Sequence, residues 1–233
     1  CEKKNLPLYV SVWEDPAKTA IETAARNFRY QAFTRVMEEE QYDTLMTAHH
    51  GDDQIETVLM KIIRGGQLST FSGIKEVQPF ATGRLVRPLL SFSKEELYAY
   101  AAESQLVYFE DQTNQLLDVQ RNRLRHLVVP QLKQENTQVM RHFQQFSQQI
   151  QWADQVIQKC MGQLIEKEVE QLKDRFQFSA EMIEKMEEAE RYYFFHSFFD
   201  KVFSETGVIL KEQQMTSILE QWQQKKSQWQ VSI

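Results

Sequence analysis

Two histidines, two aspartates and a glutamate fall within one short stretch of this sequence, at His49, His50, Asp52, Asp53 and Glu56. Asp53 and Glu56 are three positions apart, so on a helix they would share one face. Both would lie in the first turn, where the helix dipole favours carboxylates. Such a pair can hold a cationic amine or a hard metal ion such as Mg²⁺. We therefore expect Asp53 and Glu56 to be site residues, with Mg²⁺ as a candidate ligand.

The surrounding residues predict how this cluster is positioned. The apolar residues of 45–48 indicate the end of a buried strand, and Gly51 allows a turn. Asp52 or Asp53 can then cap a helix that continues to about residue 63. His49 and His50 would point to opposite sides if the strand geometry persists. A strand, a tight turn and a helix start are where open α/β sheets bind ligands.

Two other interpretations of the cluster remain open. It could be an acid-rich helix start with one hydrogen-bonded histidine and no chemistry. It could also belong to a metal-dependent phosphohydrolase, which would draw further ligands from well-separated helices. The remaining histidines, His126, His142 and His196, lie in regions that favour packing or an RNA-facing helix.

Composition limits the class of protein. The 233 residues suffice for one large or two small domains, and the net charge of -6 means that any RNA binding must use local patches. Scarce glycine and proline favour helix. The two cysteines, Cys1 and Cys160, suit a reducing cytoplasm, and no membrane span or signal peptide is visible. The start at Cys1 resembles a helix end running into a strand, so we expect a fragment lacking an upstream strand and helix.

The first 134 residues predict an α/β domain with a partial Rossmann-like parallel sheet. Residues 8–12 favour a strand, 19–40 a helix, and the next strand and helix contain the motif, giving the order β-α-β-α. Extended segments follow around a turn at 83–84. A capping box at Ser93 and Glu96 opens another helix.

Arginines form two candidate phosphate-binding groups. Arg121, Arg123 and Arg125 are the densest basic patch in the chain and suit a nucleotide or RNA phosphate. Arg26 and Arg29 lie on the predicted helix 19–40 and are weaker candidates for RNA contact. The alternative in both cases is a solvated helix face.

From residue 135 the pattern changes to that of a separate all-α domain. Apolar residues from Val139 to Leu164 recur at spacings of four and three, which predicts one long amphipathic helix. Its stripe favours packing within the chain or in a homodimer. Ser179 can cap a helix reaching about residue 202, and 212–224 predicts another.

Several stretches together resemble a known family. These are Ala48–Thr57 with Arg64-Gly65, Ala25–Tyr30, Val86–Leu90, and Asp111–Asn114 followed by Arg121–Arg125 and Pro130. In this order and spacing they resemble the bacterial tRNA(Ile)-lysidine synthetases, which are PP-loop (N-type) ATP pyrophosphatases. The resemblance covers roughly the first 135 residues. The remainder fits the family's accessory tRNA-binding domain by position only.

The resemblance implies a two-step reaction in the cytoplasm. ATP activates the O2 of the wobble cytidine of tRNA(Ile), which has a CAU anticodon, and L-lysine then displaces AMP to give lysidine. His49, Asp53, Glu56 and Arg123 would be catalytic, with Asp53 and Glu56 holding lysine and Mg²⁺. Arg121 and Arg125 would bind the phosphate of AMP or tRNA, and the helix arginines would contact tRNA.

One family feature is missing. The Ser-Gly-Gly-x-Asp-Ser phosphate loop belongs upstream of Cys1, so the resemblance implies a fragment that is inactive alone. Two alternatives follow: another PP-loop enzyme such as a tRNA thiolase, or, for the fragment, a tRNA-binding or dimerisation module. Thiolases of this kind commonly use cysteines, and no cysteine lies near the motif.

Overall fold

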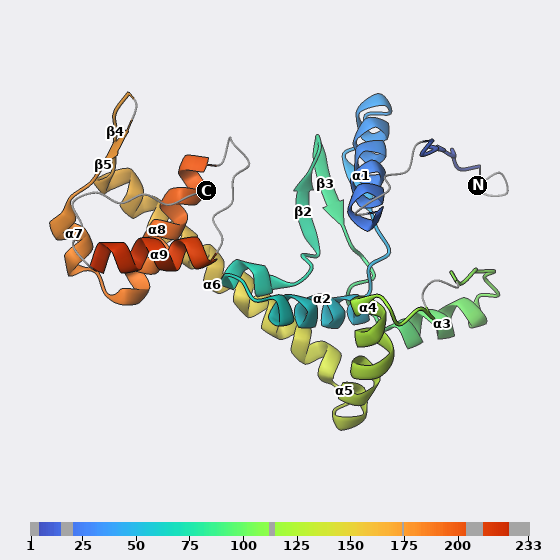
Figure 1. Ribbon diagram of the computed structural model, residues 1–233. Helices are drawn as coiled ribbons and strands as arrows, with labels where there is room; N and C mark the ends of the chain where they lie inside the picture. The colour runs from blue at the N-terminus through green and yellow to red at the C-terminus, as the bar shows by residue number, and fades with distance from the viewer. Residues whose placement is uncertain (1–4, 15–20, 112–114, 174, 204–211, 224–233) are drawn as a thin grey trace. The chain divides into compact units, whose positions relative to one another are not determined.

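The computed structural model describes residues 5–14, 21–111, 115–173, 175–203 and 212–223 (Figure 1). These residues form two compact units. The first takes in the described residues up to Ile55 together with Ile74–Val129. The second takes in Glu56–Gly73 together with the described residues from Pro130 onward. The assignment of residues 135–233 to an accessory tRNA-binding domain stays a prediction.

The first unit has a three-stranded sheet with the order β1-β3-β2. Its strands are β1 (Thr44–Met46), β2 (Val77–Phe80) and β3 (Gly83–Val86). β1 and β3 are parallel, with Leu45 opposite Leu85, whereas β2 and β3 are antiparallel. The predicted α/β class is confirmed, but the sheet is mixed rather than parallel. The sheet is mixed because a connection as short as Ala81–Thr82 can join only antiparallel strands. The turn was predicted at residues 83–84 and lies two residues earlier.

The first unit also contains several helices. The first unit contains α1 (Ile21–Glu39), the start of α2 (Gly51–Arg64), α3 (Lys94–Glu103), α4 (Gln120–Arg123) and the π-helical turn η4 (Leu124–Val128). Figure 1 shows α1 beside the strands, and the Tyr30 ring meets the Phe80 ring of β2 edge-on at 5.5 Å between centroids. The predicted capping box of α3 is present, because Ser93 and Glu96 exchange their hydrogen bonds.

The predicted strand at residues 8–12 is not formed. These residues belong to no strand, and Val10 and Val12 are more than 70% exposed, at 73% and 72%. β-branched residues favour an extended backbone, but a strand also needs a neighbour to satisfy its N–H and C=O groups. No strand of the described chain provides that neighbour.

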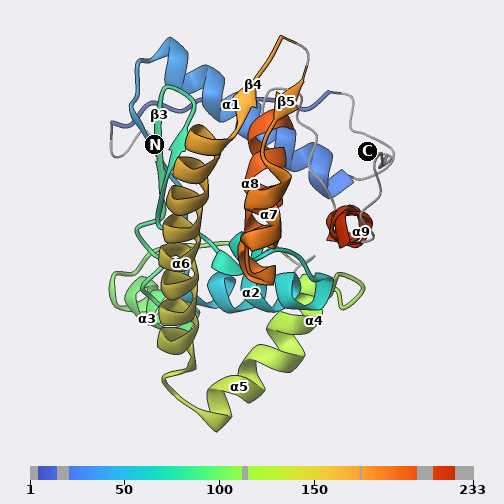
Figure 2. The same cartoon turned by 90° about the vertical axis from the view of Figure 1, so that its left-hand side faces the viewer.

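The second unit is mainly helical. Its elements are the rest of α2, η2 (Leu68–Ser72), α5 (Val129–Glu135), α6 (Val139–Glu168), β4 (Glu170–Gln171), β5 (Phe176–Gln177), α7 (Ala180–Lys185), α8 (Glu188–Phe203) and α9 (Glu212–Gln223). Figure 2 shows α6 and α8 side by side. Phe194, Phe195 and Met215 are completely buried in the aromatic core of this unit. None of the described helices has the combination of length and hydropathy needed to span a bilayer.

Three details of this unit differ from the sequence-based expectation. The antiparallel pair β4–β5 was not predicted, so the described part of the unit is not purely helical. The predicted helix after Ser179 is broken between Lys185 and Glu188 into α7 and α8. The long helix α6 is confirmed, but only part of its stripe packs: Val139 is buried, whereas Phe146 and Cys160 are exposed.

Candidate functional site

The site begins at the first turn of α2, which directly follows β1. The capping prediction placed Asp52 or Asp53 immediately before the helix. The helix instead starts at Gly51, so both aspartates lie within its first turn. The Asp53 Oδ2 atom instead accepts a hydrogen bond from the His50 backbone N–H at 2.9 Å. This bond satisfies one of the donors that a helix start leaves unpaired.

The residues on either side of Asp53 fix this turn to other segments of the first unit. Asp52 Oδ2 accepts a hydrogen bond from the backbone N–H of Lys94, at the start of α3, at 2.8 Å. Gln54 Oε1 accepts one from the backbone N–H of Ile74 at 2.6 Å. Because both side chains are buried, these bonds hold the turn rigidly and Asp53 keeps a defined position.

Two arginines of the basic patch converge on Asp53. Arg121 Nη2 donates to Asp53 Oδ1 at 2.6 Å, and Arg125 Nη2 lies 3.3 Å from the same oxygen. Asp53 is 7% exposed, so its carboxylate is largely shielded from water, whereas the Arg121 side chain stays partly open to it. The two arginines are four positions apart across α4 and η4, which places them on the same side of that helix.

His49 lies beside this cluster with one ring nitrogen occupied. Its Nδ1 atom is 2.9 Å from the Thr47 hydroxyl, which leaves Nε2 as the nitrogen that can contact a ligand. Partial burial lowers the pKa of His49 below its ordinary value of 6.5, and the charges of Arg87, Arg121 and Arg26 lower it further against the opposing effect of Asp53. His49 is therefore neutral at pH 7.

These side chains open onto one pocket of about 490 Å³ in the first unit. It is lined by Arg26, Arg29, Tyr30, Phe33, Met46, Thr47, Ala48, His49, Asp53, Arg121, Asn122 and Arg125. We call it the arginine pocket. Arg26 and Arg29 come from α1, and the Arg26 guanidinium lies over the Tyr30 ring at 4.7 Å from its centroid. Four arginines and one aspartate give the lining a net positive charge, which suits an anion such as phosphate.

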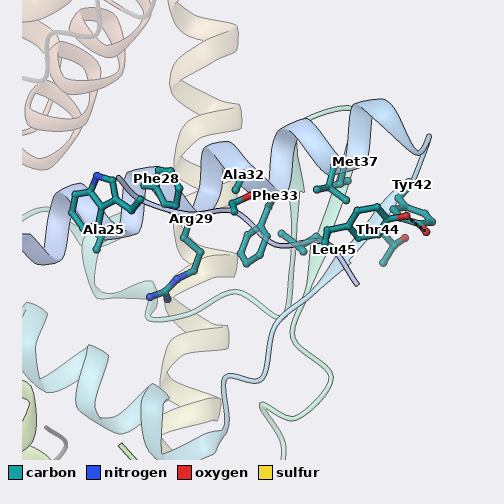
Figure 3. A pocket seen from close by; sticks show the side chains of 13 residues that line it. Ala25, Phe28, Arg29, Ala32, Phe33, Met37, Tyr42, Thr44 and Leu45 are labelled. Carbon is teal, nitrogen blue, oxygen red and sulfur yellow. Dashed lines mark hydrogen bonds between the residues drawn. The ribbon is translucent and has the colours of Figure 1, made fainter. Parts of the chain in front are cut away.

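A second, apolar pocket of about 560 Å³ lies along α1 (Figure 3). Its lining includes Trp13, Phe28 and Met37, and the Trp13 ring stacks on the Phe28 ring at 5.9 Å between centroids. Figure 3 shows Arg29 extending away from these apolar side chains. Arg29 and Phe33 line both pockets, so α1 separates an apolar hollow from a cationic one.

Two predicted catalytic residues do not line the arginine pocket. Glu56 is fully buried, and nearly all other residues in the first two turns of α2 are buried as well. Arg123 instead donates through Nη1 to the backbone carbonyls of Leu117 and Asp118, both at 2.8 Å. These bonds give Arg123 a structural role in the loop before α4. Catalytic roles for Glu56 and Arg123 stay predictions.

The residues do not fit Mg²⁺ at Asp53. A divalent cation there would face the guanidinium groups of Arg121 and Arg125, which already occupy one carboxylate oxygen. Among the described residues, no group of three or more His, Cys, Asp or Glu side chains is arranged to hold a metal ion. Asp53 is therefore unsuited to hold Mg²⁺ in this arrangement.

Sequence reasoning missed two residues of the pocket. Thr47 orients His49, and buried Asn122 donates to the Leu116 carbonyl at 2.8 Å, which fixes the loop before α4. Both fall within or next to stretches that resemble the family, but neither carries a charge that would draw attention. The predicted motif residues 112–114 lie outside the described part of the chain.

Comparison with known families defines the class of this protein. Residues 1–132, more than half of the chain, match the family model for the PP-loop domain. The chain therefore belongs to the PP-loop family.

Its curated relatives share a more specific name. The tRNA(Ile)-lysidine synthase of Enterococcus faecalis is 46% identical over 220 residues, which cover 94% of this chain and 48% of that protein. The protein of the same name from Lactiplantibacillus plantarum is 49% identical over 152 residues, covering 64% of this chain and 34% of that protein. The chain thus spans about half, or less, of the length of the relatives that it matches.

Proposed function

We propose that the complete protein is a tRNA(Ile)-lysidine synthase. In this reaction the O2 of the wobble cytidine attacks the α-phosphate of ATP and releases pyrophosphate. The amine of L-lysine then attacks C2 and AMP leaves with the oxygen. The observation that carries the proposal is the arginine pocket, which brings Asp53 and His49 together with four arginines in a PP-loop domain. The names of the relatives supply the substrate.

The positions of the residues support the following roles. Arg121 and Arg125 offset the negative charge of the phosphate during adenylation and in the AMP leaving group. His49 is neutral at pH 7 and presents Nε2, so it can orient the nucleotide by a hydrogen bond. Asp53 holds the ammonium group of lysine near the activated carbon. Positioning and electrostatics, rather than a covalent enzyme intermediate, account for the rate.

The other pocket arginines extend the anionic surface that the site can accept. Arg26 and Arg29 are exposed on α1 and contact the phosphates of tRNA near the wobble base. This interaction is electrostatic and independent of sequence, so selection of the CAU anticodon needs further contacts.

The test is lysine transfer by the complete protein to a tRNA(Ile) transcript with a CAU anticodon. We expect ATP-dependent incorporation of radiolabelled lysine, and loss of at least roughly 100-fold in Asp53→Asn, as for removal of a group that positions a reactant. The matched control is Arg84→Ala, because Arg84 is exposed on β3 outside the pocket. Incorporation by Asp53→Asn at the parent rate would refute the role of Asp53. Sulfur transfer without lysine incorporation would instead identify another PP-loop tRNA-modifying enzyme.

We further infer that the protein acts in the cytoplasm and that α6 can form a homodimer contact. Trp152 and Val156 are four positions apart on this helix and therefore share one face, and they are 59% and 61% exposed, which suits an apolar contact. Sedimentation of the parent and of Trp152→Glu tests this contact. A monomer at every concentration of the parent would exclude it.

A further inference from the structure

The carboxylate proposed to receive lysine is already occupied. Asp53 Oδ1 lies 2.6 Å from Arg121 Nη2 and 3.3 Å from Arg125 Nη2. The Oδ2 atom accepts from the His50 N–H at 2.9 Å, and His50 Nε2 lies 3.5 Å away. A lysine ammonium that enters the pocket therefore meets an aspartate whose charge two guanidinium groups have neutralised. In this arrangement the pocket repels a cation.

The same two arginines are also the natural ligands of an anion. Arg121 and Arg125 line the arginine pocket together with Arg26 and Arg29, and the Arg121 side chain is 36% exposed. A guanidinium group binds phosphate through two parallel hydrogen bonds and does so more strongly than it binds a single carboxylate oxygen. A phosphate in the pocket thus competes with Asp53 for Arg121 and Arg125.

We propose that phosphate binding unmasks Asp53: the anion takes over Arg121 and Arg125, and the released carboxylate then accepts the ammonium group of lysine. This inference rests on the proposed function, and it adds an order of binding. Nucleotide phosphate enters first and the amino acid second. The lysine subsite therefore forms only when an activated nucleotide is present to react with it.

The exchange couples the two ligands energetically. Releasing the arginines without a replacement cation would leave a buried carboxylate unpaired, which is strongly unfavourable. Lysine supplies that cation, so each ligand binds better when the other is present. Thermodynamic linkage requires the enhancement to be the same in both directions.

The test measures binding of L-lysine to the complete protein by calorimetry in phosphate-free buffer, with and without saturating AMP. We expect AMP to raise the affinity for lysine by roughly 10-fold, within the usual range of such coupling, and lysine to raise the affinity for AMP equally. If lysine and AMP both bind but the affinity for lysine is the same with and without AMP, the unmasking is overturned and the proposed function still stands. AMP binding with no lysine binding in either condition overturns both.

Variants separate masking from a general change in charge. Arg121→Ala removes the shorter ion pair to Asp53, so lysine should bind without AMP and the enhancement by AMP should shrink to roughly 2-fold or less. Arg121→Lys keeps the positive charge beside Asp53, so lysine should still bind weakly without AMP, and this variant also guards against a folding defect in the alanine variant. Arg84→Ala removes one exposed arginine outside the pocket and should leave the coupling at the parent value. The same weak lysine binding in Arg121→Ala as in the parent would contradict the proposal.

Discussion

At the scale of single residues, His49 makes the stability of the folded protein depend on pH. Its pKa in the folded protein lies below 6.5, chiefly because of burial, while the unfolded chain keeps the ordinary value. Below about pH 7 the unfolded chain therefore binds more protons at this position, and stability falls as the pH drops. We expect urea unfolding of His49→Gln to lose less stability between about pH 7 and pH 5 than the parent does. An equal or steeper loss in the variant would mean that other groups cause the acid sensitivity.

Two neighbouring arginines provide a sharper test of which residue binds phosphate. Arg121 lines the pocket and reaches Asp53, whereas Arg123 holds the carbonyls of Leu117 and Asp118. Loss of one charge-assisted hydrogen bond costs about 1.5–3 kcal/mol, so Arg121→Ala should weaken AMP binding by roughly 10-fold or more. Arg123→Ala should weaken it less and mainly lower thermal stability. The reverse order in calorimetry would restore the sequence-based assignment of Arg123.

The difference between these arginines shows what spacing alone can predict. Sequence patterns indicated that Asp53, His49 and a basic patch form the site, and the structure brings these parts together. The sequence patterns did not show which arginines reach Asp53, because Arg121 is 68 residues away from it along the chain. That choice depends on how the helix of α4 and η4 is rotated, and tertiary packing sets this rotation.

At the scale of secondary structure, Gly83 of β3 lies so close to the neighbouring backbone that it leaves no room for a side chain. A Cβ atom there would lie 2.0 Å from the Asp43 carbonyl oxygen, next to the point where Arg84 N–H donates to that oxygen at 3.0 Å. Gly83→Ala must push β3 away from the start of β1, at a cost of about 1–3 kcal/mol of unfolding free energy. Gly162→Ala is the control, because nothing lies within 4 Å of its Cβ and alanine should stabilise helix α6 by up to about 1 kcal/mol. Urea unfolding of both variants measures the two changes, and equal stability of Gly83→Ala and the parent would contradict the predicted clash.

Local signals explain which elements were predictable. The caps at Ser93 and Ser179 mark helix starts that depend only on neighbouring residues, and both are found in the structure. Residues 8–12 also carry a local strand signal, yet they form no strand. A helix satisfies its hydrogen bonds internally, whereas a strand depends on a partner that its own sequence does not specify.

At the scale of the whole molecule, an acidic chain presents a cationic pocket. The net charge is -6, but the pocket lining includes four arginines and one aspartate. The long-range field therefore does not attract RNA, and binding depends on close contact within about a Debye length, roughly 8–10 Å. Because the arginines come from two helices far apart in the sequence, folding rather than composition creates the positive patch.

Salt dependence measures how many of these arginines meet RNA phosphates. Each neutralised phosphate contributes about 0.7 to the negative slope of log affinity against log salt for single-stranded nucleic acid, because it releases condensed counterions. Arg26→Ala and Arg29→Ala should each reduce the slope for tRNA(Ile) by about 0.7 in filter-binding titrations of the complete protein. Arg84→Ala should leave the slope unchanged, since this exposed arginine lies outside the pocket. Equal slopes for the parent and the α1 variants would mean that Arg26 and Arg29 do not contact tRNA phosphates.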